Sequence, residues 1–155
     1  MTARAFTTSF EVRFPEVDSY GVVWHGHYAL YFEVARNALC AAFGLTPAEA
    51  LAHGYKVPIT HVEMSLKRPA KLDDRLEVSA VLAPSETAKL VMTYEIRRLP
   101  DGTLLATGST EQVILNPAGE LLLTLPQPVK TLVARVLAFQ RGDAEPDGTK
   151  ILPPV

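Results

Sequence analysis

The sequence lacks the features of a membrane protein, of a disulfide-rich protein and of a protein with a cysteine-rich zinc site. Cys40 is the only cysteine among 155 residues, which excludes an intrachain disulfide and a cysteine-rich zinc site. No uninterrupted apolar stretch approaches the length of a membrane-spanning helix, and Met1–Phe10 lacks the apolar core of a secretory signal. These absences predict a cytoplasmic protein with no membrane span.

The chain also lacks a strong excess of either charge. Fifteen Lys and Arg stand against 17 Asp and Glu, a formal net charge of −2, and no basic repeat is interleaved with aromatic residues. Nothing therefore suggests a nucleic-acid-binding protein. With 48% hydrophobic and 21% charged residues, the chain is long enough to form one domain with a packed core, and its function should come from a packed site.

Hydrophobic spacing predicts one long helix followed by a run of strands. Residues 27–43 repeat apolar side chains every three or four positions, and Gly44 ends the pattern. Thr46-Pro47-Ala48-Glu49 has the form of a capping box that begins a short helix ending near His53. Pro100-Asp101-Gly102 predicts a hairpin turn. The remaining predictions are strands at 6–13, 56–67, 75–83, 87–99 and 103–115, and a helix at 128–140.

This order predicts an α+β domain whose curved antiparallel sheet wraps the long helix. The domain is expected to span residues 1–140. Residues 141–155, which contain Pro146, Gly148, Pro153 and Pro154, are expected to form a loosely ordered tail.

The loop before the long helix is the best candidate for an active site. Asp18 is followed by Gly21, by His25 and by His27 at the start of the helical pattern. A carboxylate can activate water, and the first N–H groups of a helix have no partner within the helix. Those N–H groups can stabilise negative charge that develops on a substrate oxygen.

Two segments resemble the hotdog-fold acyl-CoA thioesterases of the 4-hydroxybenzoyl-CoA thioesterase type, which include a Tol-Pal-associated branch. The first contains the pattern Asp-x-x-Gly-Val-Val-x-His-x-x-Tyr, which begins at Asp18 and ends at Tyr28. The second is Leu66-Lys67-Arg68-Pro69-Ala70-Lys71-Leu72-Asp73-Asp74-Arg75-Leu76-Glu77-Val78. The order of elements matches over residues 6 to about 140, so the resemblance implies a hotdog fold.

The resemblance also implies a thioester hydrolase with a defined site. Asp18 would act as general base on water or as a nucleophile, and the backbone N–H of His25 would bind the oxyanion. Substrate-binding positions implied in this way are Gly21, Val22, Val23, Trp24, His27, Tyr28, Lys67 and Arg68. His27 and Trp24 replace residues common in relatives, which bears on the shape of the acyl pocket. Tyr28 at this spacing is more often a core residue.

The implied substrate is an acyl thioester of coenzyme A or of an acyl-carrier protein. No metal and no redox cofactor is implied, because coenzyme A is part of the substrate. Lys67, Arg68 and Lys71 either meet the coenzyme A phosphates or form a solvated rim. Hotdog domains of this kind pair, so a homodimer or homotetramer is expected.

Other interpretations stay open at this point. Asp18 and His25 could instead move protons in an acyl-thioester hydratase or dehydratase, and the domain could bind acyl-CoA or acyl-carrier protein without catalysis. Glu33 is the second-choice catalytic carboxylate, although an ion pair with Arg36 on the helix surface explains it without catalysis. The spacing of Asp18, His25 and His27 matches no zinc motif.

Overall fold

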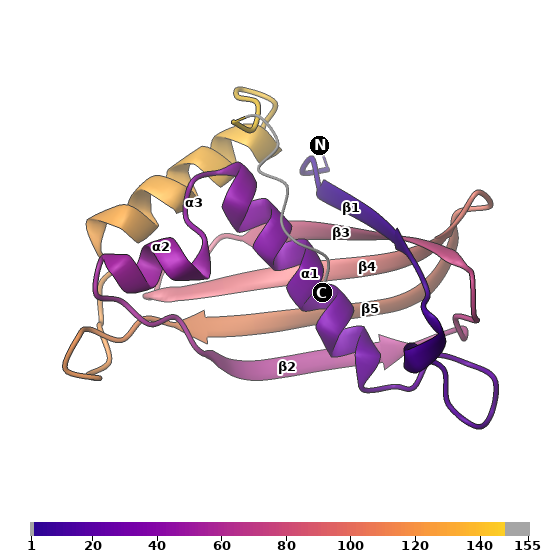
Figure 1. Ribbon diagram of the computed structural model, residues 1–155. Coiled ribbons are helices and arrows are strands. Elements are labelled where there is room, and N and C mark those ends of the chain that lie inside the picture. The colour runs from indigo at the N-terminus through magenta and orange to yellow at the C-terminus, as the bar shows by residue number, and fades with distance from the viewer. Residues whose placement is uncertain (1, 148–155) are drawn as a thin grey trace.

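A five-stranded antiparallel sheet forms the body of the computed structural model, which describes residues 2–147 (Figure 1). Its strand order is β1-β3-β4-β5-β2, so β1 and β2 are the two edges. The strands are β1 (Phe6–Glu11), β2 (Ile59–Leu66), β3 (Arg75–Ala83), β4 (Lys89–Leu99) and β5 (Thr103–Val113). Each lies within or at the limits of the strand that the sequence predicts. The predicted hairpin joins β4 to β5, where Gly102 has φ +72° and donates to the Arg98 carbonyl at 2.8 Å.

The long helix α1 (His27–Ala42) crosses one face of the curved sheet, as the hydrophobic spacing predicts (Figure 1). Its inner side chains are buried, and Phe32 stacks on Tyr94 of β4 with ring centroids 4.6 Å apart. A Cβ atom at Gly108 of β5 would lie 2.4 Å from the Phe32 ring. Glycine at position 108 therefore lets the helix approach the sheet closely.

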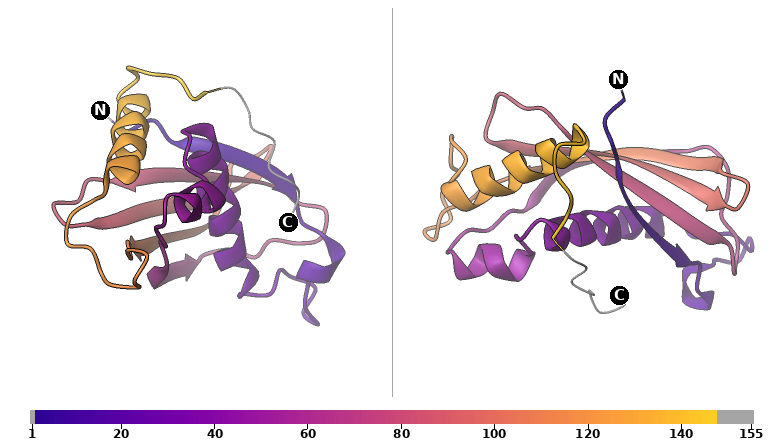
Figure 2. Two further views of the ribbon diagram at one scale, coloured as in Figure 1. Left: turned by 60° about the vertical axis from the view of Figure 1, so that its left-hand side comes forward. Right: turned by 90° about the horizontal axis from the view of Figure 1, so that it is seen from above.

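Two shorter helices cover one end of this layer (Figure 2). α2 (Pro47–Ala52) begins with the predicted capping box, because Glu49 N donates to Thr46 Oγ1 at 3.1 Å and Thr46 N donates to Glu49 Oε2 at 2.7 Å. α3 (Gln127–Gln140) ends beside β3. There the Gln140 amide accepts from Leu82 N at 2.7 Å and donates to Leu82 O at 3.0 Å, so it pairs with β3 beyond the start of β1.

Residues 141–147 fold back toward α1 and the N-terminal segment. Arg4 and Glu145 form an ion pair at 2.7 Å, and Asp147 N donates to the Ala42 carbonyl at 3.0 Å. The rest of the predicted tail, 148–155, lies outside the described residues, so the domain limit at residue 140 stays a prediction. Within residues 2–147, no helix is both long enough and apolar enough to cross a membrane.

Candidate active site

The loop between β1 and α1 closes on itself directly before the helix. Val17 and Val23 form an isolated antiparallel bridge, and Asp18 N donates to the Val22 carbonyl at 2.9 Å. Gly21 has φ +77°, a conformation that favours glycine, and its N–H donates to the Asp18 carbonyl at 3.0 Å. This tight turn fixes the backbone of Asp18 beside the residues that lead into α1.

The Asp18 carboxylate is partly exposed and accepts few hydrogen bonds. Its Oδ1 accepts the Tyr20 N–H at 2.8 Å, the local bond that an aspartate makes in a turn. No ion pair or second hydrogen bond reaches the carboxylate from residues 2–147. Its other oxygen is therefore available to water or to a substrate.

The start of α1 presents free amides close to this turn. The N-cap is Gly26, and no side chain caps the helix. His27 N donates to the Trp24 carbonyl at 2.9 Å, whereas the N–H groups of His25 and Gly26 have no acceptor in the described part of the chain. Unpaired amides at a helix N-terminus favour a negatively charged oxygen. The structure thus leaves the predicted oxyanion donor, the His25 N–H, free.

The indole ring of Trp24 lies against Gly26 at the helix start. A Cβ atom at Gly26 would lie 2.0 Å from Trp24 Cζ3, so a larger residue there would displace the ring. Trp24 is 48% exposed, and its ring lies 4.9 Å from the His25 ring and 5.8 Å from the His27 ring. The structure therefore brings two predicted substrate-binding side chains, Trp24 and His27, together with the predicted catalytic residue His25 around the first turn of α1.

A buried carboxylate that sequence reasoning missed holds the same loop. Glu16 in the short helix η1 (Phe14–Glu16) is 3% exposed. Its Oε1 accepts the Arg13 N–H at 2.9 Å and the Tyr31 hydroxyl at 3.2 Å, and its Oε2 accepts from the Arg13 guanidinium at 3.3 Å. Its backbone carbonyl accepts Trp24 N at 2.9 Å. Glu16 thus ties the loop to α1, and the only signal in the sequence is the three-residue spacing of Arg13 and Glu16.

The environment of Tyr31 reflects this burial. Desolvation, then the negative charge of Glu16, raises the pKa of the Tyr31 phenol well above its ordinary value. The phenol therefore stays protonated and serves as the donor to Glu16.

Val23 and Tyr28, both predicted to bind substrate, attach the loop to the segment after β2. Val23 N donates to the Ala70 carbonyl at 2.8 Å, and Ala70 N donates to the Tyr28 hydroxyl at 3.2 Å. Tyr28 is 2% exposed, and burial raises the pKa of its phenol. This placement gives Tyr28 a structural task, in keeping with its spacing in the sequence.

Lys67 and Arg68 lie at the end of β2, shortly before Ala70. Their N–H groups both donate to the Leu105 carbonyl, at 2.8 and 3.0 Å, and their side chains are exposed. Because the bonds of Ala70 join this segment to the loop, both cations lie at the same end of the molecule as Asp18. Phosphate groups of a ligand could reach them there from solvent.

The second-choice carboxylate, Glu33, lies away from the helix start. It is 52% exposed and almost two helical turns beyond His27, about 9 Å along the axis. Its predicted partner Arg36 is 3.7 Å away, but Arg36 is only 7% exposed, which corrects the expectation of a pair on the helix surface. The helix carries Arg36 under neighbouring elements rather than into solvent.

Cys40 is a poor candidate for an alternative nucleophile. Burial raises the pKa of the Cys40 thiol to about 11, so the thiol is neutral at neutral pH and a poor nucleophile. Across residues 2–147, no three His, Cys, Asp or Glu side chains are grouped so that they could hold a metal ion.

Comparison with known proteins identifies the family of this chain and the class of its fold. The family model of the Thioesterase-like superfamily matches residues 12–133. The chain is 28% identical over 111 residues to a putative acyl-CoA thioesterase, YneP of Bacillus subtilis, covering 72% of this chain and 67% of YneP. It is 25% identical over 130 residues to the acyl-CoA thioester hydrolase YbgC of Escherichia coli, covering 84% and 88% of the two chains. The structure of a DHNA-CoA thioesterase from Staphylococcus aureus superposes with a TM-score of 0.78 at 25% identity, covering 90% of this chain and 96% of that one.

The chain belongs to the Thioesterase-like superfamily. This membership confirms the resemblance stated from the sequence and the α+β hotdog fold. It also confirms the prediction of an enzyme that hydrolyses thioesters.

Proposed function

We propose that the protein is an acyl-CoA thioesterase in which Asp18 is the catalytic carboxylate and the helix start binds the oxyanion. One observation carries this proposal. The Val17–Val23 bridge fixes an aspartate with an available oxygen beside a helix start whose His25 and Gly26 amides have no protein acceptor. A carboxylate that acts as base or nucleophile and two free N–H donors are the groups that attack on a thioester carbonyl needs.

The chemistry follows from this arrangement. Asp18 takes a proton from water as the water oxygen attacks the thioester carbonyl, or Asp18 attacks the carbonyl itself and water then hydrolyses the anhydride. In both routes the carbonyl oxygen becomes negative and accepts N–H bonds from the helix start. Collapse of the intermediate breaks the carbon–sulfur bond, and the thiolate leaves and takes up a proton. One oxyanion donor can contribute about 2.7–4 kcal/mol to such a step.

Coenzyme A is the carrier that we propose. The relative YneP is described as a putative acyl-CoA thioesterase and YbgC as an acyl-CoA thioester hydrolase. The basic residues Lys67 and Arg68 lie exposed at the same end of the molecule as Asp18. These cations would pair with the phosphates of the nucleotide portion. The reaction needs no metal and no redox cofactor, because coenzyme A enters as part of the substrate. We propose that the reaction takes place in the cytoplasm. The one cysteine, Cys40, is unpaired, so the fold does not depend on a disulfide that an oxidising compartment would have to form.

We further propose that the enzyme works as a homodimer or as a tetramer built from dimers. Among residues 2–147, β2 is an edge strand with β5 as its one neighbour, and nearly all residues of β2 are exposed. Ile59, Val62 and Leu66 on this strand are 37%, 43% and 46% exposed. An open edge with apolar side chains favours pairing with a second chain. Val62→Lys should raise the monomer fraction measured by light scattering, and an unchanged mass would contradict pairing through β2.

The release of free thiol from acyl-CoA tests the function directly. The wild-type protein should release thiol from at least some members of an acyl-CoA panel, and Asp18→Asn should lower kcat by about 100-fold or more. Asp101→Asn is the matched control, because Asp101 also accepts the N–H two residues ahead, from Thr103 at 3.2 Å, but lies in the β4–β5 turn and not in the loop before α1. Wild-type turnover that survives in Asp18→Asn would remove Asp18 from the mechanism.

The same panel separates hydrolysis from the hydratase alternative. A hydratase would consume an unsaturated acyl thioester and release no thiol, whereas the proposed reaction releases one thiol for each acid formed. If no thiol appears but a thioester analogue still binds to wild type and to Asp18→Asn, the domain is a binding module.

A further inference from the structure

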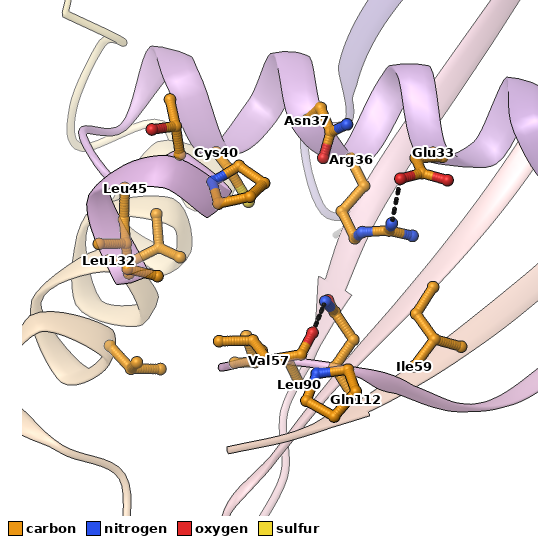
Figure 3. Close-up of a pocket in the computed structure, with 15 residues that line it drawn as sticks. Glu33, Arg36, Asn37, Cys40, Leu45, Val57, Ile59, Leu90, Gln112 and Leu132 are labelled. Carbon is orange, nitrogen blue, oxygen red and sulfur yellow. Dashed lines mark hydrogen bonds and ion pairs between the residues drawn. The ribbon is translucent and has the colours of Figure 1, made fainter. Parts of the chain in front are cut away.

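A cavity of about 410 Å³ lies beside the second half of α1 (Figure 3). Its walls come from α1, α2, the segment that enters β2, β4, β5 and α3. Most of this wall is apolar and includes Leu45, Val57, Leu90 and Leu132. The volume falls within the range of small-molecule sites, which is about 300–1,000 Å³.

A buried guanidinium without a full set of partners borders this cavity. Arg36 is 7% exposed, and its Nη2 lies 3.7 Å from Glu33. In the described part of the chain, its Nη1 is the one buried side-chain nitrogen or oxygen with no hydrogen-bond partner. Burying a charged donor without an acceptor is costly, so such a group in a native fold indicates a missing partner.

The neighbouring polar groups do not supply that partner. The Tyr94 hydroxyl is bonded to Thr110 Oγ1 at 2.7 Å, and hydrogen bonding and charge from the Arg36 guanidinium lower the pKa of this phenol against the raising effect of burial. Nη1 of Arg36 still has no acceptor among the described residues. On the opposite wall, the Gln112 amide donates to the Val57 carbonyl at 2.9 Å (Figure 3). The acceptor that Arg36 lacks would therefore come from a molecule in the cavity.

One face of α1 runs from the proposed catalytic end to this cavity. Positions 26, 30, 33, 37 and 40 follow each other at intervals of four and three, so they lie on one stripe of the helix. Gly26 begins the stripe at the free amides, and Glu33, Asn37 and Cys40 line the cavity. Ten residues separate Gly26 from Arg36, about 15 Å along the axis. A zigzag carbon chain with bonds of about 1.5 Å advances about 1.3 Å per bond, so an acyl chain of roughly ten to twelve carbons with a terminal oxygen spans about 12–15 Å.

We propose that this cavity holds the acyl chain and that Arg36 binds an oxygen atom near its far end. The preferred substrates are then medium-chain acyl thioesters with a terminal hydroxyl or carboxylate, rather than plain fatty acyl thioesters. This proposal rests on the proposed function, because it places the thioester at the start of α1. The apolar wall contacts the methylene chain, and the guanidinium gains the acceptor that the protein does not provide.

The test compares three coenzyme A thioesters of equal length: decanoyl, 10-hydroxydecanoyl and 9-carboxynonanoyl. Wild type should hydrolyse at least one oxygenated chain with a kcat/KM about tenfold above that of decanoyl. Arg36→Met keeps the length of the side chain but removes its donors. It should abolish this preference by raising KM for the oxygenated chain while decanoyl hydrolysis is retained. The hydroxyl and carboxylate arms show whether a neutral or an anionic oxygen is bound.

The matched control is Arg141→Met, because Arg141 is an exposed arginine whose partner is Asp143 at 3.0 Å, beyond the end of α3. This variant should keep the wild-type preference. Equal preference ratios in wild type and Arg36→Met would overturn the proposal. If Arg36→Met fails to fold, Ala50→Leu, which narrows the cavity from α2, should lower kcat/KM for all three chains and leave that for acetyl-CoA unchanged. Ala50→Leu with full activity on all three would also overturn it.

Failure of the proposed function gives a different result. If wild type hydrolyses no coenzyme A thioester, calorimetry with the free acids still tests the cavity. Binding of 10-hydroxydecanoic or decanedioic acid to wild type, about tenfold weaker in Arg36→Met, would retain the site. Failure of all three free acids, decanoic acid included, to bind would remove it.

Discussion

Glu16 and Asp18 are carboxylates two residues apart, and the structure treats them in opposite ways. Glu16 is 3% exposed, and both of its oxygens accept hydrogen bonds, from Tyr31 and from the main chain and side chain of Arg13. Asp18 is partly exposed and accepts one bond, from the Tyr20 N–H in its own turn. A carboxylate whose oxygens are all engaged cannot readily accept a proton from water. The loop therefore uses Glu16 to fix its shape, and we propose that it leaves Asp18 for chemistry.

The comparison predicts that position matters more than charge at Asp18. Asp18→Glu keeps the charge but adds one carbon–carbon bond of about 1.5 Å. Misplacing a catalytic group by about 1 Å can cost about 100-fold, so we expect kcat to fall by about 10- to 100-fold with an unchanged free energy of unfolding. Steady-state thiol release and urea unfolding measure the two quantities. Activity within twofold of wild type would mean that Asp18 contributes charge alone.

At Glu16 the expected effect is on stability. In wild type, the two carboxylate oxygens of Glu16 accept from three donors, which are the Arg13 N–H, the Arg13 guanidinium and the Tyr31 hydroxyl. Glu16→Gln keeps only one acceptor oxygen, so at least one of these buried hydrogen bonds weakens. We expect the free energy of unfolding to fall by about 1–2 kcal/mol, and kcat to fall by less than tenfold. Denaturant unfolding monitored by the fluorescence of Trp24 gives the first number. A stability equal to wild type would show that the buried network does not hold the loop.

The smallest expected effect is on the free energy of unfolding at alkaline pH. Desolvation and the charge of Glu16 raise the pKa of Tyr31 in the folded state, so the unfolded chain loses this proton first, near pH 10. The stability that protonated Tyr31 contributes to the folded state is fully present below pH 10 and is lost as the pH rises above this value. Tyr31→Phe should lose less stability than wild type between pH 10 and 11, by up to about 1 kcal/mol. Asp18→Asn should follow the wild-type profile, and a flattened profile in that variant would contradict the separation of roles.

Much of the fold could be predicted from local sequence patterns. The spacing of apolar residues in 27–43 gave α1 to within one residue, and the turn residues between β4 and β5 gave the hairpin, because both signals lie within a few residues of what they determine. Asp18 could be singled out for the same reason, since it stands directly before a glycine turn and a helix start.

Glu16 and Arg36 could not be found in this way. Glu16 is buried because Tyr31, 15 residues away, turns its hydroxyl toward the loop. Arg36 is buried because it lies among elements brought together by the fold, with Cys40 of its own helix and Gln112 of β5 lining the same cavity. In the sequence alone, Glu33 and Arg36 have the three-residue spacing of a surface ion pair. Tertiary contacts decide which member of such a pair is exposed.

The most direct test measures activity and stability together in the two carboxamide variants. The account predicts that Asp18→Asn loses at least about 100-fold in single-turnover thiol release and keeps its free energy of unfolding within about 0.5 kcal/mol. Glu16→Gln should show the reverse, with a clear loss of stability and less than a tenfold loss of rate. A larger loss of rate in Glu16→Gln than in Asp18→Asn would contradict the assignment of the chemistry to Asp18.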